Sequence, residues 1–149
     1  IWGSAFFAIF AVMIIISRPL VGKAYARYGS KYIIYPGLVL FILGLLALGI
    51  ATTPLTIILT APLLGLGYGA AQPAFQALAI QSAPIERAGV STATYFLALD
   101  ISVGAGSVIL ALLASAVGYQ YLYMFTAVTM IVALALYHIW IKRYTPLEL

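Results

Sequence analysis

Residues 33–51 read IIYPGLVLFILGLLALGIA, a run that contains no charged side chain. A helix of about 20 apolar residues spans the roughly 30 Å hydrocarbon core of a bilayer, so this run predicts a membrane-spanning helix. Polar and apolar residues do not alternate as in a spanning β-strand, and a helix satisfies its own backbone hydrogen bonds in lipid. Four similar runs lie around it. We therefore predict an all-α, polytopic transmembrane helical bundle of about five helices, at about residues 2–17, 33–51, 55–80, 90–117 and 121–141.

The composition agrees with a lipid environment. Of the 149 residues, 65% are hydrophobic and 7% are charged, and the mean hydropathy is +1.16. A soluble domain carries roughly 25% charged residues, so we expect the lipid bilayer to be the main partner of this chain. The net charge of +4 comes from basic residues in the connections between spans, which indicates membrane topology and not nucleic-acid binding. With one His and no Cys, we expect no metal site, no catalytic residues and no enzyme activity.

The start of the chain does not resemble a secretory signal peptide. The first residue is Ile1, and an apolar run begins almost at once. This run is followed by Arg18 and Lys23, where a signal peptide would have a small-residue cleavage site. We expect the chain to begin inside a longer protein.

The basic residues predict the orientation of the bundle. All of them fall in alternate connections or in the tail, and so on one side of the membrane: Arg18, Lys23, Arg27, Lys31, Arg87, Lys142 and Arg143. The connections near Thr52 and Tyr119 have none. By the positive-inside rule, the N-terminus lies outside the cell membrane and the C-terminus is cytoplasmic.

The first connection carries a recognisable motif. Residues 22–31 read GKAYARYGSK and resemble the cytoplasmic loop signature of the major facilitator superfamily. Four positions match that signature: Gly22, Arg27, Gly29 and Lys31. Ala26 stands where the family has an acidic residue. The resemblance implies a charge-based cytoplasmic gate, and a simple topology anchor is the alternative.

The resemblance covers essentially the whole chain. Residues 65–73, 86–89, 93–96, 98–101 and 104–107 are similar to helices ten and eleven of bacterial drug-efflux-type members. This implies that residues 1–149 are part of the C-terminal half of a twelve-helix transporter, helices eight to twelve, with the missing N-terminal half as a partner. The implied function is secondary active transport by alternating access, with proton-coupled efflux of a small organic compound and no cofactor. The alternatives are an importer of sugars or organic acids, and a structural membrane protein that transports nothing.

One face of the predicted third helix is small and polar. Gly65 and Gly69 form a GxxxG pair, which lets helix backbones approach closely in lipid, so we expect both to serve helix packing. Gln72 and Gln76 continue the same stripe. Their amides need hydrogen bonds, so this end of the stripe faces either another helix or a water-filled substrate pathway.

Two ionisable side chains other than tyrosine lie within the predicted spans, Asp100 and His138. An intramembrane carboxylate is costly unless it is paired, neutralised or hydrated, so Asp100 is a candidate for the substrate or proton pathway. A structural hydrogen bond is the alternative. Its helix face is shared by small residues, Gly104, Ser107, Ala111 and Ser115, so we expect Asp100 to point into the bundle and Gly104 to serve packing. His138 is expected to be an interfacial residue without a specific role.

Overall fold

The computed structural model describes residues 2–144, apart from the side chains of Lys142 and Tyr144. This part of the chain contains no strand and five long helices: α1 (Trp2–Tyr28), α2 (Lys31–Ile50), α3 (Pro54–Gln81), α4 (Ala88–Val117) and α5 (Tyr119–Tyr144), with a short 3-10 helix, η1 (Ile85–Arg87), before α4. All five are long and apolar enough to cross a membrane. The predicted all-α transmembrane bundle is confirmed.

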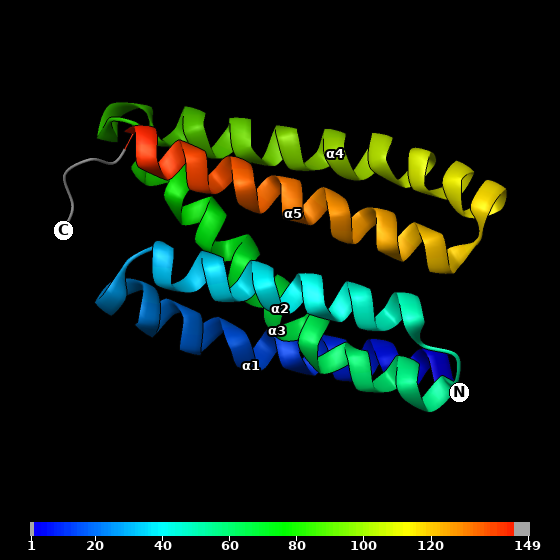
Figure 1. Ribbon diagram of the computed structural model, residues 1–149. Coiled ribbons are helices and arrows are strands. Elements are labelled where there is room, and N and C mark those ends of the chain that lie inside the picture. The colour runs from blue at the N-terminus through cyan, green and yellow to red at the C-terminus, as the bar shows by residue number, and fades with distance from the viewer. Residues whose placement is uncertain (1, 145–149) are drawn as a thin grey trace.

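The helices lie in two layers joined by α3 (Figure 1). α1 and α2 pack on opposite sides of α3 in the first layer and touch each other only lightly, and α4 and α5 form a hairpin in the other layer. α3 crosses obliquely from the first layer to the second, and its most extensive contacts are with α2 and α1. α2 also packs against α5, whereas α4 touches α3 and α5 only lightly. α3 is therefore the central helix of the bundle.

α1 is much longer than the sequence predicts. Its predicted span ends at residue 17, and Pro19 and Gly22 indicate a loop after it, but both residues lie inside the helix. That expectation is wrong because the hydrocarbon thickness limits the apolar run and not the helix, which continues with exposed polar side chains. Arg18, expected in a loop, lies ten residues before the end of α1, or about 15 Å along its axis.

Short turns link the helices at both ends of the bundle. Gly29 ends α1 with φ +83°, and its N–H donates to the carbonyl of Tyr25 at 2.9 Å. Gly118 ends α4 in the same way, with φ +86°. These left-handed conformations favour glycine because a Cβ would be strained there. Before α3, Thr53 and Thr56 form a reciprocal capping box, which gives the tight turn after α2.

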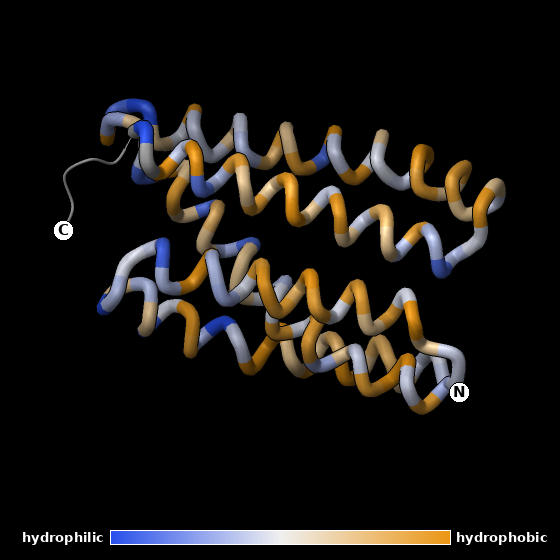
Figure 2. Tube along the Cα trace, in the orientation of Figure 1, coloured by the Kyte–Doolittle hydropathy of each residue, from blue (hydrophilic) through white to orange (hydrophobic). Residues whose placement is uncertain are grey.

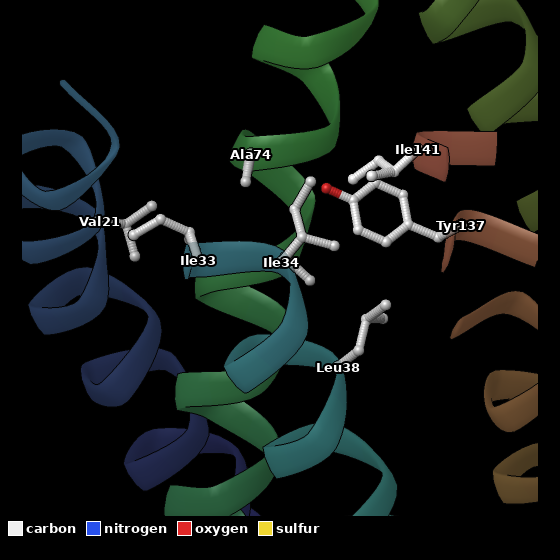
Figure 3. Packing of buried hydrophobic residues seen from close by; sticks show 8 residues of the cluster. Val21, Ile33, Ile34, Leu38, Ala74, Tyr137 and Ile141 are labelled. Atoms are coloured by element: carbon white, nitrogen blue, oxygen red, sulfur yellow. The ribbon is translucent and has the colours of Figure 1, made fainter. Parts of the chain in front are cut away.

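The buried core is made by four of the five helices. One cluster holds side chains of α1, α2, α3 and α5: Val21, Ile33, Ile34, Leu38, Ala71, Ala74, Tyr137 and Ile141. Figure 3 shows Ile34 at its centre, between α3 and the ring of Tyr137 on α5. A second cluster joins α2, α3 and α5 through Leu45, Leu48, Leu64 and Ala127. α4 contributes no buried residue, so one whole helix lies outside the core.

The hydrophilic residues gather at one end of the bundle (Figure 2). We call this the basic end. It comprises the α1–α2 connection, the α3–α4 connection and the end of α5, and it includes Arg27, Lys31, Arg87 and Arg143. The opposite end, with residues 51–53 and 118, carries no charged residue. The helix ends thus separate cleanly by charge, as in a multi-pass membrane protein.

Candidate functional site

The glycines of α3 bring α1 into close contact. A Cβ added at Gly65 would lie 2.7 Å from Met13 Cβ and 2.8 Å from the carbonyl oxygen of Phe10. At Gly69, an added Cβ would collide with Ser17 Oγ. Both glycines therefore lie where α3 and α1 approach most closely, as a GxxxG pair does in lipid.

Gly67 makes a second close approach, on the opposite side of α3. A Cβ there would lie 2.6 Å from the backbone nitrogen of Phe41 and 2.8 Å from the carbonyl oxygen of Gly37, both on α2. Two glycines thus meet backbone to backbone across the α2–α3 contact. The sequence signal for this contact was the Gly-x-Gly-x-Gly spacing, since alternate glycines fall on opposite helix faces. Gly104, also expected to serve packing, has no atom of the described residues within 4 Å of an added Cβ.

Gln72 and Gln76 extend the glycine stripe toward the basic end, and both are partly buried. The carbonyl oxygen of Gln72 accepts a hydrogen bond from Tyr95 Oη of α4 at 3.2 Å. Neither side-chain amide has a hydrogen-bond partner among residues 2–144. Each amide has two donors and an acceptor to satisfy, so these two positions favour a hydrated or ligand-bearing neighbour.

Asp100 lies on an exposed face of α4. Its carboxyl makes no hydrogen bond or ion pair with any described residue. The four small residues that share its face are exposed or open as well: Gly104, Ser107, Ala111 and Ser115. The other described helices therefore leave this face uncovered, and our expectation that it points into the bundle of the full-length protein stays a prediction.

The remaining polar groups of α4 are satisfied. Ser107 and Ser115 donate to backbone carbonyls three residues earlier, at 2.9 and 2.8 Å. The hydroxyls of Thr92, Thr94 and Ser102 donate to carbonyls four residues earlier. Ser91, near the start of the helix, donates to α3 instead. Asp100 is thus the one polar side chain of α4 that has no hydrogen-bond partner among the described residues.

The structure does not bring Asp100 and the two glutamines together. Tyr95, which contacts α3 next to Gln72, precedes Asp100 by five residues. Five residues correspond to a rotation of about 140° around the helix. Asp100 therefore faces away from α3, and the two polar groups lie on separate surfaces of the chain.

The loop motif is spread over a helix end and a short turn. Gly22 lies in α1 with no described atom within 4 Å of an added Cβ, and Lys31 begins α2. Gly29 provides the turn, as described above. The Arg27 guanidinium stacks over the ring of Tyr28, 5.5 Å from its centroid, a cation–π contact. Arg27 and Lys31 have no ion-pair partner within the described residues, and the charge-based gate that the resemblance implies stays a prediction.

His138 has a partner that sequence reasoning missed. Its Nδ1 lies 2.6 Å from Tyr35 Oη, which links α5 to α2 near the basic end. The same tyrosine ring packs edge-on against Tyr137, with centroids 5.4 Å apart. No sequence pattern indicates this pair, because it depends on how α2 and α5 are aligned in space.

We expect Tyr35→Phe to lower the free energy of unfolding of the full-length protein by about 0.5–1 kcal/mol, since it removes the hydroxyl and leaves the ring. Thermal unfolding of the purified protein in detergent measures this loss. Tyr119→Phe is the matched control, because that side chain is 69% exposed and its hydroxyl makes no hydrogen bond to a described residue. Equal stability of the Tyr35 and Tyr119 variants would mean that the Tyr35–His138 hydrogen bond does not contribute.

Comparison with known proteins assigns the chain to a family. The family model described as Major Facilitator Superfamily matches residues 3–148. The chain is 29% identical over 149 residues to "Uncharacterized MFS-type transporter YhhS" of Escherichia coli (strain K12), covering 99% of this chain and 36% of that protein. The protein of the same name in Salmonella typhimurium (strain LT2) is 28% identical over 147 residues, covering 97% of this chain and 36% of the relative.

The chain thus spans about a third of the length of the curated relatives that it matches. No solved structure matches it significantly. The five helices that could span a membrane, and the close glycine contacts of α3 with α1 and α2, agree with the family match. The chain belongs to the Major Facilitator Superfamily of membrane transport proteins.

Proposed function

We propose that the full-length protein is a secondary active transporter that exports small organic compounds in exchange for protons, by alternating access. The observation that carries this proposal is Asp100, an unsatisfied carboxyl on a small-residue face of a long apolar helix. A carboxyl in the hydrocarbon region is costly, and such residues usually bind ions, protons or substrates. A carboxyl at this position of a helix that faced only lipid would be costly and would have no group to bind.

We further propose that the rest of the full-length protein covers α4. α4 has no buried residue within the described chain, and the chain spans about a third of the length of the relatives that it matches. The uncovered small-residue stripe is suited to a close approach by another helix or to a water-filled space. On this proposal, residues 1–149 are helices eight to twelve of twelve, and Asp100, Gln72 and Gln76 contribute to the pathway between the two halves.

The proposed orientation in the cell membrane places the basic end in the cytoplasm and the N-terminus of this chain outside. It is supported by the grouping of Arg27, Lys31, Arg87 and Arg143 at one end of the bundle. The opposite end, with Thr53 and Gln120, carries no charge.

Single cysteines test this orientation. The chain contains no cysteine, so labelling has no background from these residues once any cysteines elsewhere in the full-length protein are replaced. A membrane-impermeant thiol reagent added to intact cells is expected to label cysteine at Thr53 or Gln120. Cysteine at Ser30 or Gln81 is expected to react only after the membrane is opened. The reverse pattern would overturn the orientation.

Proton exchange in everted membrane vesicles tests the transport proposal. Respiration acidifies the vesicle lumen, and a dye that reports the pH difference detects any compound whose uptake releases protons. Lipophilic organic cations and neutral aromatic compounds are expected to collapse part of the pH difference in vesicles with the full-length protein, and not in vesicles without it. In intact cells, alkalinisation of the medium by a sugar or an organic acid would instead show a proton-coupled importer. No response to any class would favour a structural membrane protein.

A further inference from the structure

A polar hollow lies at the basic end of the bundle, where α1, α2, α3 and α5 meet. Its volume is about 790 Å³. Most of its lining is aromatic or polar: Tyr25, Tyr28, Ser30, Lys31, Tyr32, Gln81, Ser82 and Trp140. Among the described residues, the lining contains one cation, Lys31, and no carboxylate. The charge of the hollow therefore suits an anion.

These groups include several hydrogen-bond donors. Tyr25 Oη donates to Gln81 Oε1 at 3.0 Å, which occupies the acceptor of that amide and leaves its NH₂ group for another partner. Ser30 precedes α2 but makes no side-chain capping bond to the first N–H groups of that helix. Lys31 adds an ammonium group beside them. A phosphate group, which accepts many hydrogen bonds, matches this set of donors.

A buried hydroxyl beside the hollow is also without a partner. The Tyr137 side chain is 6% exposed, and its hydroxyl has no hydrogen-bond partner among the described residues. Figure 3 shows this hydroxyl directed from α5 toward Ile34. Ser30, which lines the hollow, is its polar neighbour. This buried donor lies beside Ser30, at the helix end that lines the hollow.

An apolar groove lies next to the polar hollow. Its volume is about 910 Å³, and it runs between α3, α4 and α5. Its lining is mostly apolar, with Phe75, Ala79, Ala133, Leu136 and Ile139, and it also includes the cation Arg143 at the basic end. Leu78, Ser82 and Trp140 line both the groove and the hollow. A polar hollow and an apolar groove with shared walls fit a molecule that has an anionic head and an apolar chain.

We propose that the hollow and the groove together bind one anionic phospholipid of the leaflet at the basic end. The phosphate group lies in the hollow near Lys31, and one acyl chain lies in the groove. Tyrosine and tryptophan side chains prefer the headgroup depth of a bilayer, and basic pockets between membrane helices bind anionic headgroups. The site depends neither on the transported compound nor on which leaflet holds the basic end.

Quenching of Trp140 by brominated lipids tests the site directly, because this residue lines both spaces. The full-length protein in detergent is titrated with phosphatidylglycerol or phosphatidylcholine that carries bromine on its acyl chains. The difference between wild type and Trp140→Phe isolates the signal of this residue. We expect phosphatidylglycerol to quench it at about fivefold lower concentration than phosphatidylcholine. Equal quenching by the two lipids, or none, would overturn the proposal.

Substitutions test the binding of the lipid headgroup and the binding of its acyl chain separately. Lys31→Gln is expected to abolish the preference for phosphatidylglycerol, while Arg87→Gln, a cation at the same end outside both linings, keeps it. Ala133→Phe fills the groove from an exposed position and is expected to reduce quenching by both lipids. Excess inorganic phosphate is expected to leave quenching unchanged; displacement would mean that a free anion site and not a lipid site is present. A preference that survives Lys31→Gln would also refute the assignment.

Discussion

Asp100→Asn is expected to abolish proton-driven transport by the full-length protein while leaving the amount of folded protein unchanged. Asparagine preserves the size of the side chain and its ability to form hydrogen bonds, but it removes the group that binds and releases a proton. Within residues 2–144 the carboxyl has no partner whose loss would destabilise the fold. The vesicle assay described above measures the effect, with protein amount followed by immunoblotting of the membranes.

Glu86→Gln is the matched control, because Glu86 is an exposed carboxyl on η1 at the basic end. It is expected to transport at the wild-type rate. Wild-type transport by Asp100→Asn would remove Asp100 from the coupling mechanism. A purely structural role would give a different pattern, with Asp100→Asn nearly silent and Asp100→Leu lowering folded yield through an unsatisfied partner outside this chain.

Gly67→Ala is expected to destabilise the full-length protein by about 1–3 kcal/mol, the usual effect of overpacking a tight contact. The added Cβ would lie 2.6 Å from the backbone nitrogen of Phe41, so α2 and α3 must separate along their length. Backbone atoms cannot move aside as a flexible side chain can. Gly67→Leu, with a larger side chain at the same place, is expected to leave little folded protein.

Gly89→Ala provides the control for this prediction, because an added Cβ at Gly89 has no described atom within 4 Å. Alanine is favoured over glycine in a helix by roughly 0.5–1 kcal/mol, so this variant is expected to be equally or more stable. Both are compared by thermal unfolding in detergent. A Gly67→Ala protein as stable as Gly89→Ala would show that α2 and α3 are not in backbone contact there.

The number and type of the helices could be predicted because bilayer thickness imposes a length on every apolar segment. The end of α1 could not, since Pro19 and Gly22 indicate a loop while the helix continues to Tyr28. Hydropathy reports where the hydrocarbon ends, and a helix is free to extend beyond it. The turns at Gly29 and Gly118 were readable, because glycine alone takes the required backbone conformation easily.

The sequence predicts parts of the candidate site only where residues at a short, regular spacing indicate a helix contact. The Gly65–Gly69 spacing indicates a close helix contact but does not say that α1 provides it. The Tyr35–His138 hydrogen bond depends on the alignment of helices far apart in the sequence, so no local pattern indicates it. The stripe around Asp100 predicts a covered face, yet none of the other described helices covers it.

In the proposed mechanism, a compound and a proton cross the membrane in opposite directions. Purified full-length protein in proteoliposomes with a trapped pH-sensitive dye tests it most directly, using a compound identified in the vesicle assay. An outward gradient of that compound is predicted to acidify the lumen as the compound leaves, and Asp100→Asn is predicted to show no acidification. Compound efflux through the wild-type protein without any change in lumen pH would rule out exchange with protons.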